Sequence, residues 1–295
     1  MNNISMVYSA AVTPMNRDES VDLEGLKSNI RWQIGQGLGG VLVCGGTGEF
    51  VSLTSEERRA VVETAAGEIS GRCGFMVGCA AETTREAIRH ARHAEANGAD
   101  SVLLIASYYF KPSRDELIAH MRAVASAVKI PVVLYNNPGS CGSDLTPDIA
   151  AELARCENVR HIKEASGAAE RTRQILDACP PGFHVLCGCD YLIAEILRQG
   201  GDGWVSITAG ALPGQSQHMF DAMRAGREAE ALALWDRFRE LYTVCEQPYK
   251  PVQTVKFMMD AIGQAAGPCR LPRLPLTEAE GHAVLAMMRE AGLSV

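Results

Sequence analysis

The sequence predicts an α/β fold, a (β/α)8 or TIM barrel, with a C-terminal helical appendage. Eight short apolar runs alternate with helical segments, a pattern typical of parallel sheets. The runs are almost continuously apolar, as in strands that are buried on both faces. A doubly wound open sheet is the alternative. The eight candidate strands are Met6–Thr13, Gly40–Gly45, Phe75–Ala80, Ser101–Ala106, Pro131–Tyr135, Val159–Ala165, His184–Gly188 and Gly203–Thr208.

The segments between these strands have helical periodicity. Leu23, Leu26, Ile30 and Ile34, for example, fall on one helix face. Several helix ends are marked by residues that satisfy free backbone groups. The predicted capping boxes are Thr54 with Glu57, Thr83 with Glu86 and Ser113 with Glu116, and the other end signals are Thr146-Pro147 and Asn97-Gly98.

The chain continues past the eighth strand with helical patterns such as Leu234, Phe238 and Leu241, and without a further strand candidate. We therefore expect residues 1–225 to form the catalytic barrel and residues 226–295 to form a helical region packed on it.

Composition excludes several classes of function. The net charge is −7 and no basic block is present, so we expect no nucleic acid partner. The apolar runs are shorter than the about 20 residues that span a bilayer, so no membrane partner is expected. The ten cysteines lie scattered, with no signal peptide before them, which predicts reduced thiols in the cytoplasm. Cys187-x-Cys189 is too sparse for zinc, and no metal or cofactor is expected.

A glycine-rich loop follows the second predicted strand, at the barrel end where functional groups belong. In Gly45–Glu49 the glycines allow backbone N–H groups to converge on an anion beside the Thr47 hydroxyl. A plain glycine-rich turn is the alternative. Gly35-x-Gly37-x-x-Gly40 matches the dinucleotide fingerprint only formally, because a helix precedes it and a strand follows.

Two further side chains suggest chemistry at strand ends. Lys163 lies in an apolar strand, which disfavours the ammonium form and favours a neutral amine that can attack a ketone. Tyr135 ends the fifth strand, where its phenol could transfer a proton. The alternatives are a solvated or paired lysine and a core tyrosine.

Together these motifs resemble the family of dihydrodipicolinate synthase and N-acetylneuraminate lyase over nearly the whole chain. The matching segments are Thr13-Pro14, Val21-Asp22, Gly45–Glu49, Tyr108-Tyr109, Tyr135-Asn136-x-Pro138, Ile162-Lys163-Glu164, Gly188 and Arg270-Leu271-Pro272.

The resemblance implies roles for several of these residues. Lys163 forms an imine with a 2-oxo acid, while Thr47 and adjacent N–H groups hold its carboxylate. Tyr135 moves protons during imine formation, and Tyr109 enters the site of a neighbouring subunit, which implies a homodimer or homotetramer. The resemblance also assigns to the site Gly46, Gly188, Val205 and Ser206.

Departures from the family pattern bear on the substrate. Where this chain has Gly46, the synthases have a residue whose hydroxyl links two tyrosines. Where it has Ser140, they have an arginine that binds the carboxylate of their aldehyde substrate. The loop Gly45–Phe50 is similar to that of 5-dehydro-4-deoxyglucarate dehydratases. Asp190 corresponds to an acid with which N-acetylneuraminate lyases bind substrate hydroxyls. A hydroxylated 2-oxo acid is therefore the expected substrate.

The resulting hypothesis is a class I Schiff-base lyase that acts on pyruvate or a hydroxylated 2-oxo acid, by aldol cleavage, dehydration or deamination. One alternative is 4-hydroxy-tetrahydrodipicolinate synthase, which condenses pyruvate with aspartate semialdehyde in lysine biosynthesis. The other, motivated by Gly46 and Ser140, is a barrel that binds a 2-oxo acid without turnover.

Overall fold

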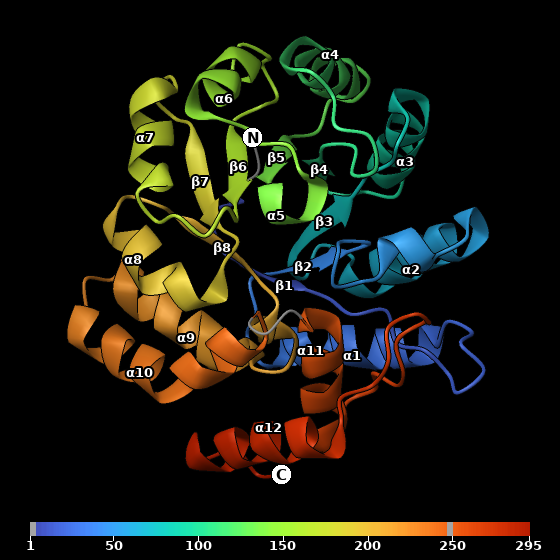
Figure 1. The fold of residues 1–295 in the computed structure, drawn as a ribbon, viewed down its shortest axis with the longest axis vertical. Helices are drawn as coiled ribbons and strands as arrows, with labels where there is room; N and C mark the ends of the chain where they lie inside the picture. Colours follow the sequence, from blue (N-terminus) through green and yellow to red (C-terminus); the bar gives the residue numbers. More distant parts are fainter. Residues whose placement is uncertain (1–3, 247–249) are drawn as a thin grey trace. The chain divides into compact units, whose positions relative to one another are not determined.

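The computed structural model describes residues 4–246 and 250–295. Its eight strands are parallel and follow one another in chain order around a closed barrel (Figure 1). All eight predicted strands and the TIM-barrel fold class are confirmed. The strands are β1 (Val7–Ala10), β2 (Gly40–Val43), β3 (Gly74–Gly78), β4 (Ser101–Ile105), β5 (Val132–Asn136), β6 (His161–Glu164), β7 (His184–Cys187) and β8 (Gly203–Ser206).

Helices connect these strands and continue after β8. The α-helices are α1 (Leu23–Gly35), α2 (Ser55–Ile69), α3 (Thr84–Ala96), α4 (Arg114–Ala125), α5 (Pro138–Cys141), α6 (Pro147–Leu153), α7 (Arg171–Ala178), α8 (Ile193–Arg198), α9 (Pro213–Arg224), α10 (Glu228–Val244), α11 (Pro251–Ala261) and α12 (Glu278–Glu290). Short 3-10 turns are η1 (Phe50–Ser52), η2 (Asp190–Leu192) and η3 (Thr208–Gly210).

The predicted helix ends are largely confirmed. Complete capping boxes begin α2 and α4 at Thr54 and Ser113. At α3 only half of the predicted box forms, because the Glu86 carboxylate pairs with Arg89 instead of returning to Thr83. Gly98 follows α3 with a φ of 78°, the left-handed conformation that glycine adopts without steric cost.

The chain divides into two compact units. In the described residues the first unit comprises residues 4–6 and 75–205, and the second comprises Val7–Gly74 and Ser206–Val295. The predicted boundary between residues 225 and 226 stays a prediction.

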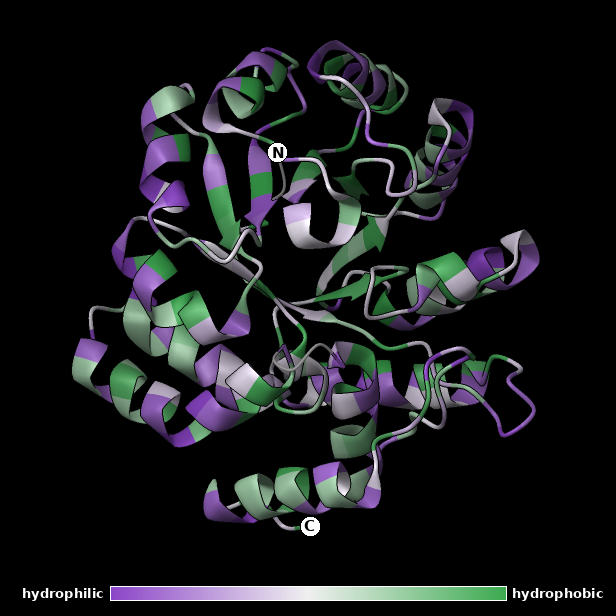
Figure 2. Cartoon of the chain, in the orientation of Figure 1, coloured by the Kyte–Doolittle hydropathy of each residue, from purple (hydrophilic) through white to green (hydrophobic). Residues whose placement is uncertain are grey.

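The first unit contains most of β3 to β8 and the helices α3 to α8. Its strands are buried almost throughout, whereas its helices carry both hydrophobic and hydrophilic residues (Figure 2). β6 is polar at both ends. His161 at its start stacks on His184 with ring centroids 4.8 Å apart, and burial, followed by the nearby His184, lowers the pKa of His161 to about 3. The imidazole is therefore neutral at physiological pH.

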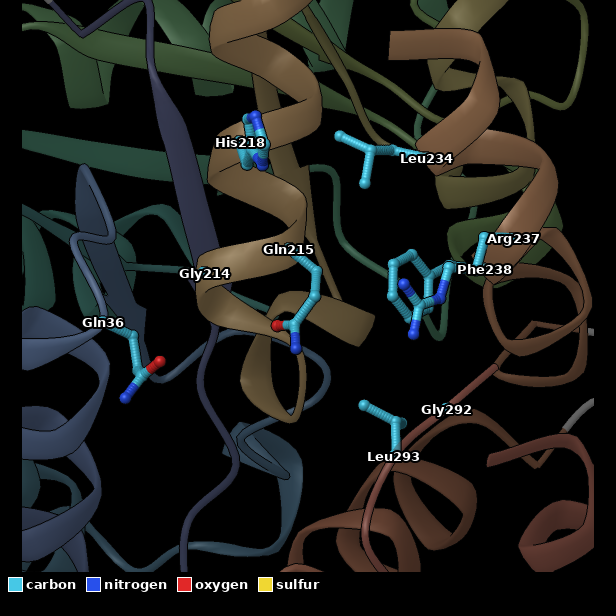
Figure 3. Close-up of a pocket in the computed structure, with 9 residues that line it drawn as sticks. All are labelled: Gln36, Gly214, Gln215, His218, Leu234, Arg237, Phe238, Gly292 and Leu293. Atoms are coloured by element: carbon cyan, nitrogen blue, oxygen red, sulfur yellow. The ribbon is translucent and has the colours of Figure 1, made fainter. Parts of the chain in front are cut away.

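The second unit pairs β1 with β2 and packs α1 on α2 and α9 on α10. A cavity of about 340 Å³ lies beside α9 and α10 (Figure 3). Its lining includes the side chains of Gln36, Gln215, His218, Leu234, Arg237 and Phe238. Arg237 Nε also donates to the carbonyl of Ala291 at 2.7 Å, which satisfies a free group at the end of α12.

Within the described part of the chain, every helix is too short or too polar to cross a membrane. Within these same described residues, the ten cysteines form no disulfide.

Candidate active site

Lys163 and Tyr135 are direct neighbours on β6 and β5. The Lys163 side chain is 4% exposed, and its Nζ atom lies 4.2 Å from the centroid of the Tyr135 ring. Among residues 4–246 and 250–295, no carboxylate forms an ion pair with this amine. The structure therefore brings together the two predicted catalytic groups of the first unit, with the amine held against an aromatic face.

The carboxylate next to Lys163 in the chain is engaged elsewhere. Glu164 is 1% exposed, and its oxygens accept hydrogen bonds from Asn136 Nδ2 at 2.9 Å and the Ser166 N–H at 2.6 Å. Asn136 also donates to Asp144, which accepts two hydrogen bonds from Arg171. The sequence motifs contained Asn136 and Glu164, but their pairing was not predicted. This pairing joins the ends of β5 and β6, which carry Tyr135 and Lys163.

Gly188 lies directly against the lysine side chain. A Cβ atom at this position would lie 2.9 Å from Lys163 Cε, 2.8 Å from Ala165 Cβ and 2.8 Å from the Glu164 carbonyl oxygen. Such distances are shorter than real carbon contacts, and the backbone carbonyl cannot move away easily. Position 188 must therefore be glycine if Lys163 is to keep its position.

We expect Gly188→Ala to displace Lys163 and to lower kcat by at least about tenfold, since small misplacements of a reacting group are costly. Gly67→Ala is the matched control, because the added methyl group has no neighbour within 4 Å among the described residues. Gly98→Ala would be unsuitable, because Gly98 has a positive φ. Steady-state kinetics of Gly188→Ala and Gly67→Ala measure the expected loss of kcat. Wild-type kcat in Gly188→Ala would contradict it.

The Tyr135 hydroxyl has a partner that sequence reasoning missed. Asn137 Nδ2 donates a hydrogen bond to Tyr135 Oη at 2.9 Å, while Asn137 Oδ1 accepts from the Ser140 N–H at 3.1 Å. Asn137 is thus the N-cap of α5, followed by Pro138 in the first turn. An asparagine before proline signals a helix start, but the sequence does not indicate the bond to the phenol.

Ser140, where the family's arginine stands in the synthases, is exposed on α5. Tyr109 is 78% exposed, and its ring lies edge-on against Phe110 with centroids 4.8 Å apart. The backbone N–H groups of Tyr108 and Tyr109 both donate to Glu82 Oε1, at 2.9 and 3.0 Å. Glu82 was not predicted. Its carboxylate fixes the backbone of this aromatic loop.

Asp190 lies in the core of the first unit. Its side chain is 0% exposed, and Oδ1 accepts a hydrogen bond from the indole Nε1 of buried Trp204 at 2.8 Å. This geometry gives no support to a contact with substrate hydroxyls, because the carboxylate is engaged within the core. Val205 and Ser206 are also fully buried, and Ser206 Oγ accepts from the Ala209 N–H at 2.9 Å.

In the second unit, the predicted anion loop follows β2. Gly46 is exposed and Thr47 is largely buried, and Thr13 Oγ1 donates to the Gly48 carbonyl at 2.7 Å. Cys44, which precedes the loop, and Glu49, which ends it, have φ angles of 56° and 55°. This left-handed backbone is costly for residues other than glycine, so the surrounding structure has to stabilise it.

A buried ion pair stabilises the loop from the C-terminal part of the chain. Glu49 is 0% exposed and pairs with Lys256, which is 2% exposed, at an N–O distance of 2.7 Å. Glu49 Oε2 also accepts the Arg270 N–H at 3.1 Å, and Lys256 Nζ donates to the Pro268 carbonyl at 2.8 Å. Both charges are thus compensated, as buried charges must be.

Arg270 extends this support to the start of α2. Its guanidinium forms a bidentate pair with Glu57 and donates to the carbonyls of Glu19 and Ser52. The hydrogen bonds from Arg270 lower the pKa of Glu57 to about 2. Arg270 therefore connects three segments of the second unit, which explains the Arg270-Leu271-Pro272 motif in structural terms.

A family model described as the dihydrodipicolinate synthetase family matches residues 3–291. The chain belongs to this family. The match confirms the family that the sequence motifs predicted. As a member of this family, the chain is a Schiff-base-forming lyase.

Relatives and solved structures agree with this family. The chain is 39% identical to a 4-hydroxy-tetrahydrodipicolinate synthase of Methanoculleus marisnigri, over 93% of this chain and 94% of that one. A synthase of the same name from Azoarcus sp. is 36% identical, over 96% and 97%. The crystal structure of the chloride-inhibited dihydrodipicolinate synthase from Acinetobacter baumannii, complexed with pyruvate, matches with a TM-score of 0.94 at 32% identity, over 99% and 100%.

Proposed function

We propose that this dihydrodipicolinate synthetase family member forms an imine between Lys163 Nζ and the 2-oxo carbon of pyruvate or a hydroxylated 2-oxo acid. The observation that carries the proposal is a buried lysine that has no carboxylate partner among the described residues and is held against the ring of a strand-end tyrosine. The reaction is then aldol cleavage, or dehydration or deamination, next to the imine carbon.

The steps follow from these groups. The Lys163 amine adds to the carbonyl carbon, and the carbonyl oxygen takes a proton from the Tyr135 hydroxyl. Loss of water from this adduct gives the iminium, which withdraws electrons from the neighbouring carbon and so allows a bond there to break. Thr47 and the N–H groups of its loop bind the substrate carboxylate, and Gly46, Gly188, Val205 and Ser206 contribute to the substrate site.

The aromatic loop supports a homo-oligomeric enzyme. Tyr109 and Phe110 are 78% and 77% exposed, which is unusual for large aromatic side chains. In our proposal Tyr109 of one subunit enters the site of its neighbour in a homodimer or homotetramer, in the cytoplasm.

The substrate is proposed from the differences between this chain and the synthases. Ser140 cannot bind a carboxylate as an arginine does. A Cβ at Gly46 would have no atom of the described residues within 4 Å, so the space beside this position is open. Both features favour a hydroxylated 2-oxo acid over an aspartate-derived aldehyde. Asp190 stays a candidate for substrate binding only if its bond to Trp204 breaks.

A second candidate is condensation of pyruvate with aspartate semialdehyde. It is favoured by several relatives that are 34–39% identical over at least 90% of this chain and are named 4-hydroxy-tetrahydrodipicolinate synthase.

The decisive experiment is borohydride reduction in the presence of pyruvate. We expect the intact mass to rise by one reduced pyruvate adduct per subunit, and unchanged mass would refute the proposal. Turnover on a panel of sugar-acid-derived 2-oxo acids, compared with condensation of pyruvate and aspartate semialdehyde, separates the two candidates. Turnover of neither set by a protein that forms the adduct would indicate binding without catalysis.

A further inference from the structure

The environment of the Tyr135 hydroxyl differs from the proton relay that the family resemblance implies. In that relay a hydroxyl side chain precedes the loop threonine, but here the residue is Gly46, which has no side chain to donate or accept a proton. In the first unit the Tyr135 oxygen instead accepts a hydrogen bond from Asn137 Nδ2 at 2.9 Å.

The orientation of the Asn137 amide is fixed by its second bond. Oδ1 accepts from the Ser140 N–H at 3.1 Å, and a backbone N–H can only donate. The NH2 group of the amide must therefore be the end that faces the phenol. Because an amide NH2 donates only, the Tyr135 hydroxyl keeps its own hydrogen free for another acceptor.

This arrangement has a chemical consequence for Tyr135. When the phenol gives its proton to the substrate oxygen, negative charge develops on Oη, and a donor already in place stabilises it. The amide is neither an acid nor a base near neutral pH, so Asn137 cannot pass the proton on. It can only orient the ring and stabilise the charged oxygen.

We propose that Asn137 is a positioning residue that orients the Tyr135 hydroxyl and stabilises its deprotonated form during imine formation, in place of the relay hydroxyl that Gly46 lacks. This inference rests on the proposed function. The proton on Tyr135 is then renewed from water or from the substrate, and not through a chain of protein hydroxyls.

The test compares two substitutions. Asn137→Ser keeps an N-cap oxygen for α5, since serine caps as well as asparagine, but it is too short to donate to Tyr135. Asn137→Asp keeps the size and the cap, but its carboxylate accepts a hydrogen bond from the phenol and so retains the proton there. Thr83→Ala, which removes the N-cap bond of α3 without touching Tyr135, is the control for the loss of a cap.

We expect the rate of borohydride-trapped adduct formation at saturating pyruvate to fall about tenfold or more in both Asn137 variants, the loss expected for one hydrogen bond to a charged group. The pH–rate profile should move to higher pH, more for Asn137→Asp, while KM for pyruvate stays near wild type. Thr83→Ala should match wild type in rate and profile.

Unchanged rates and profiles in both variants would overturn the inference. A lower melting temperature with an unchanged pH profile would also overturn it, because Asn137 would then act only as a cap. If the wild-type protein forms no adduct, the proposed function is wrong as a whole. If the wild type forms the adduct and the Asn137 variants form it at the same rate and with the same pH profile, only this inference is wrong.

Discussion

Replacing Lys163 by alanine is expected to abolish the borohydride-trapped pyruvate adduct and to lower kcat by at least about 10³-fold, as removal of a covalent nucleophile does. Lys163→Arg should be equally inactive, because a guanidinium stays protonated and cannot form the imine. The measurements are intact mass after reduction and steady-state turnover.

Two controls distinguish chemistry from folding. Lys129→Ala removes an exposed lysine and should retain full adduct formation. Thermal unfolding of Lys163→Ala should show a folded protein, since the buried amine has no ion-pair partner among the described residues to leave uncompensated. A stoichiometric adduct in Lys163→Ala would show that another amine is the nucleophile.

The second large effect concerns the buried ion pair between Glu49 and Lys256. Lys256→Met leaves the Glu49 carboxylate at 0% exposure with the more distant Arg273 guanidinium, at 3.7 Å, as its remaining cation among the described residues, so we expect the free energy of unfolding to fall by up to about 3–5 kcal/mol. Denaturant titration of the wild type and the variant measures this free energy of unfolding. The double variant Lys256→Met/Glu49→Gln should regain part of the loss, because it removes the buried charge.

A matched control lies in the same part of the chain. Lys250 pairs with Glu280 at 2.6 Å, but both side chains are about one-third exposed, so Lys250→Met should cost less than about 1 kcal/mol. If Lys250→Met and Lys256→Met lowered the free energy of unfolding equally, burial would not explain the stabilising effect of the Glu49–Lys256 pair. We also expect Lys256→Met to raise KM for pyruvate, since Glu49 belongs to the loop proposed to bind the carboxylate.

Much of the barrel could be predicted because its signals are local. Apolar runs of strand length and capping residues such as Thr54 and Ser113 act within one turn or one strand, and they identified all eight strands. The neighbouring positions of Lys163 and Tyr135 follow from the parallel register of β5 and β6.

Most of the contacts that were missed depend on partners that are distant in the sequence. The pairing of Glu49 with Lys256 joins segments far apart in the sequence, and no local pattern identifies one charged residue as the partner of another. The Trp204 indole likewise engages Asp190, a residue whose family position alone suggested substrate binding. Asn137 carried a local signal for a helix start, but its bond to Tyr135 depends on the path of the loop after β5.

The anchoring of the glycine-rich loop also constrains when this enzyme can mature during its synthesis. The bond from the Arg270 N–H to Glu49 spans 221 residues, so the loop emerges from a ribosome long before its anchors exist. Until the last segment has been translated and has folded back, nothing compensates the Glu49 charge or stabilises the left-handed backbone at Cys44 and Glu49. A nascent or C-terminally truncated chain therefore carries Lys163, the proposed nucleophile, before the loop of Gly45–Glu49 has its anchors.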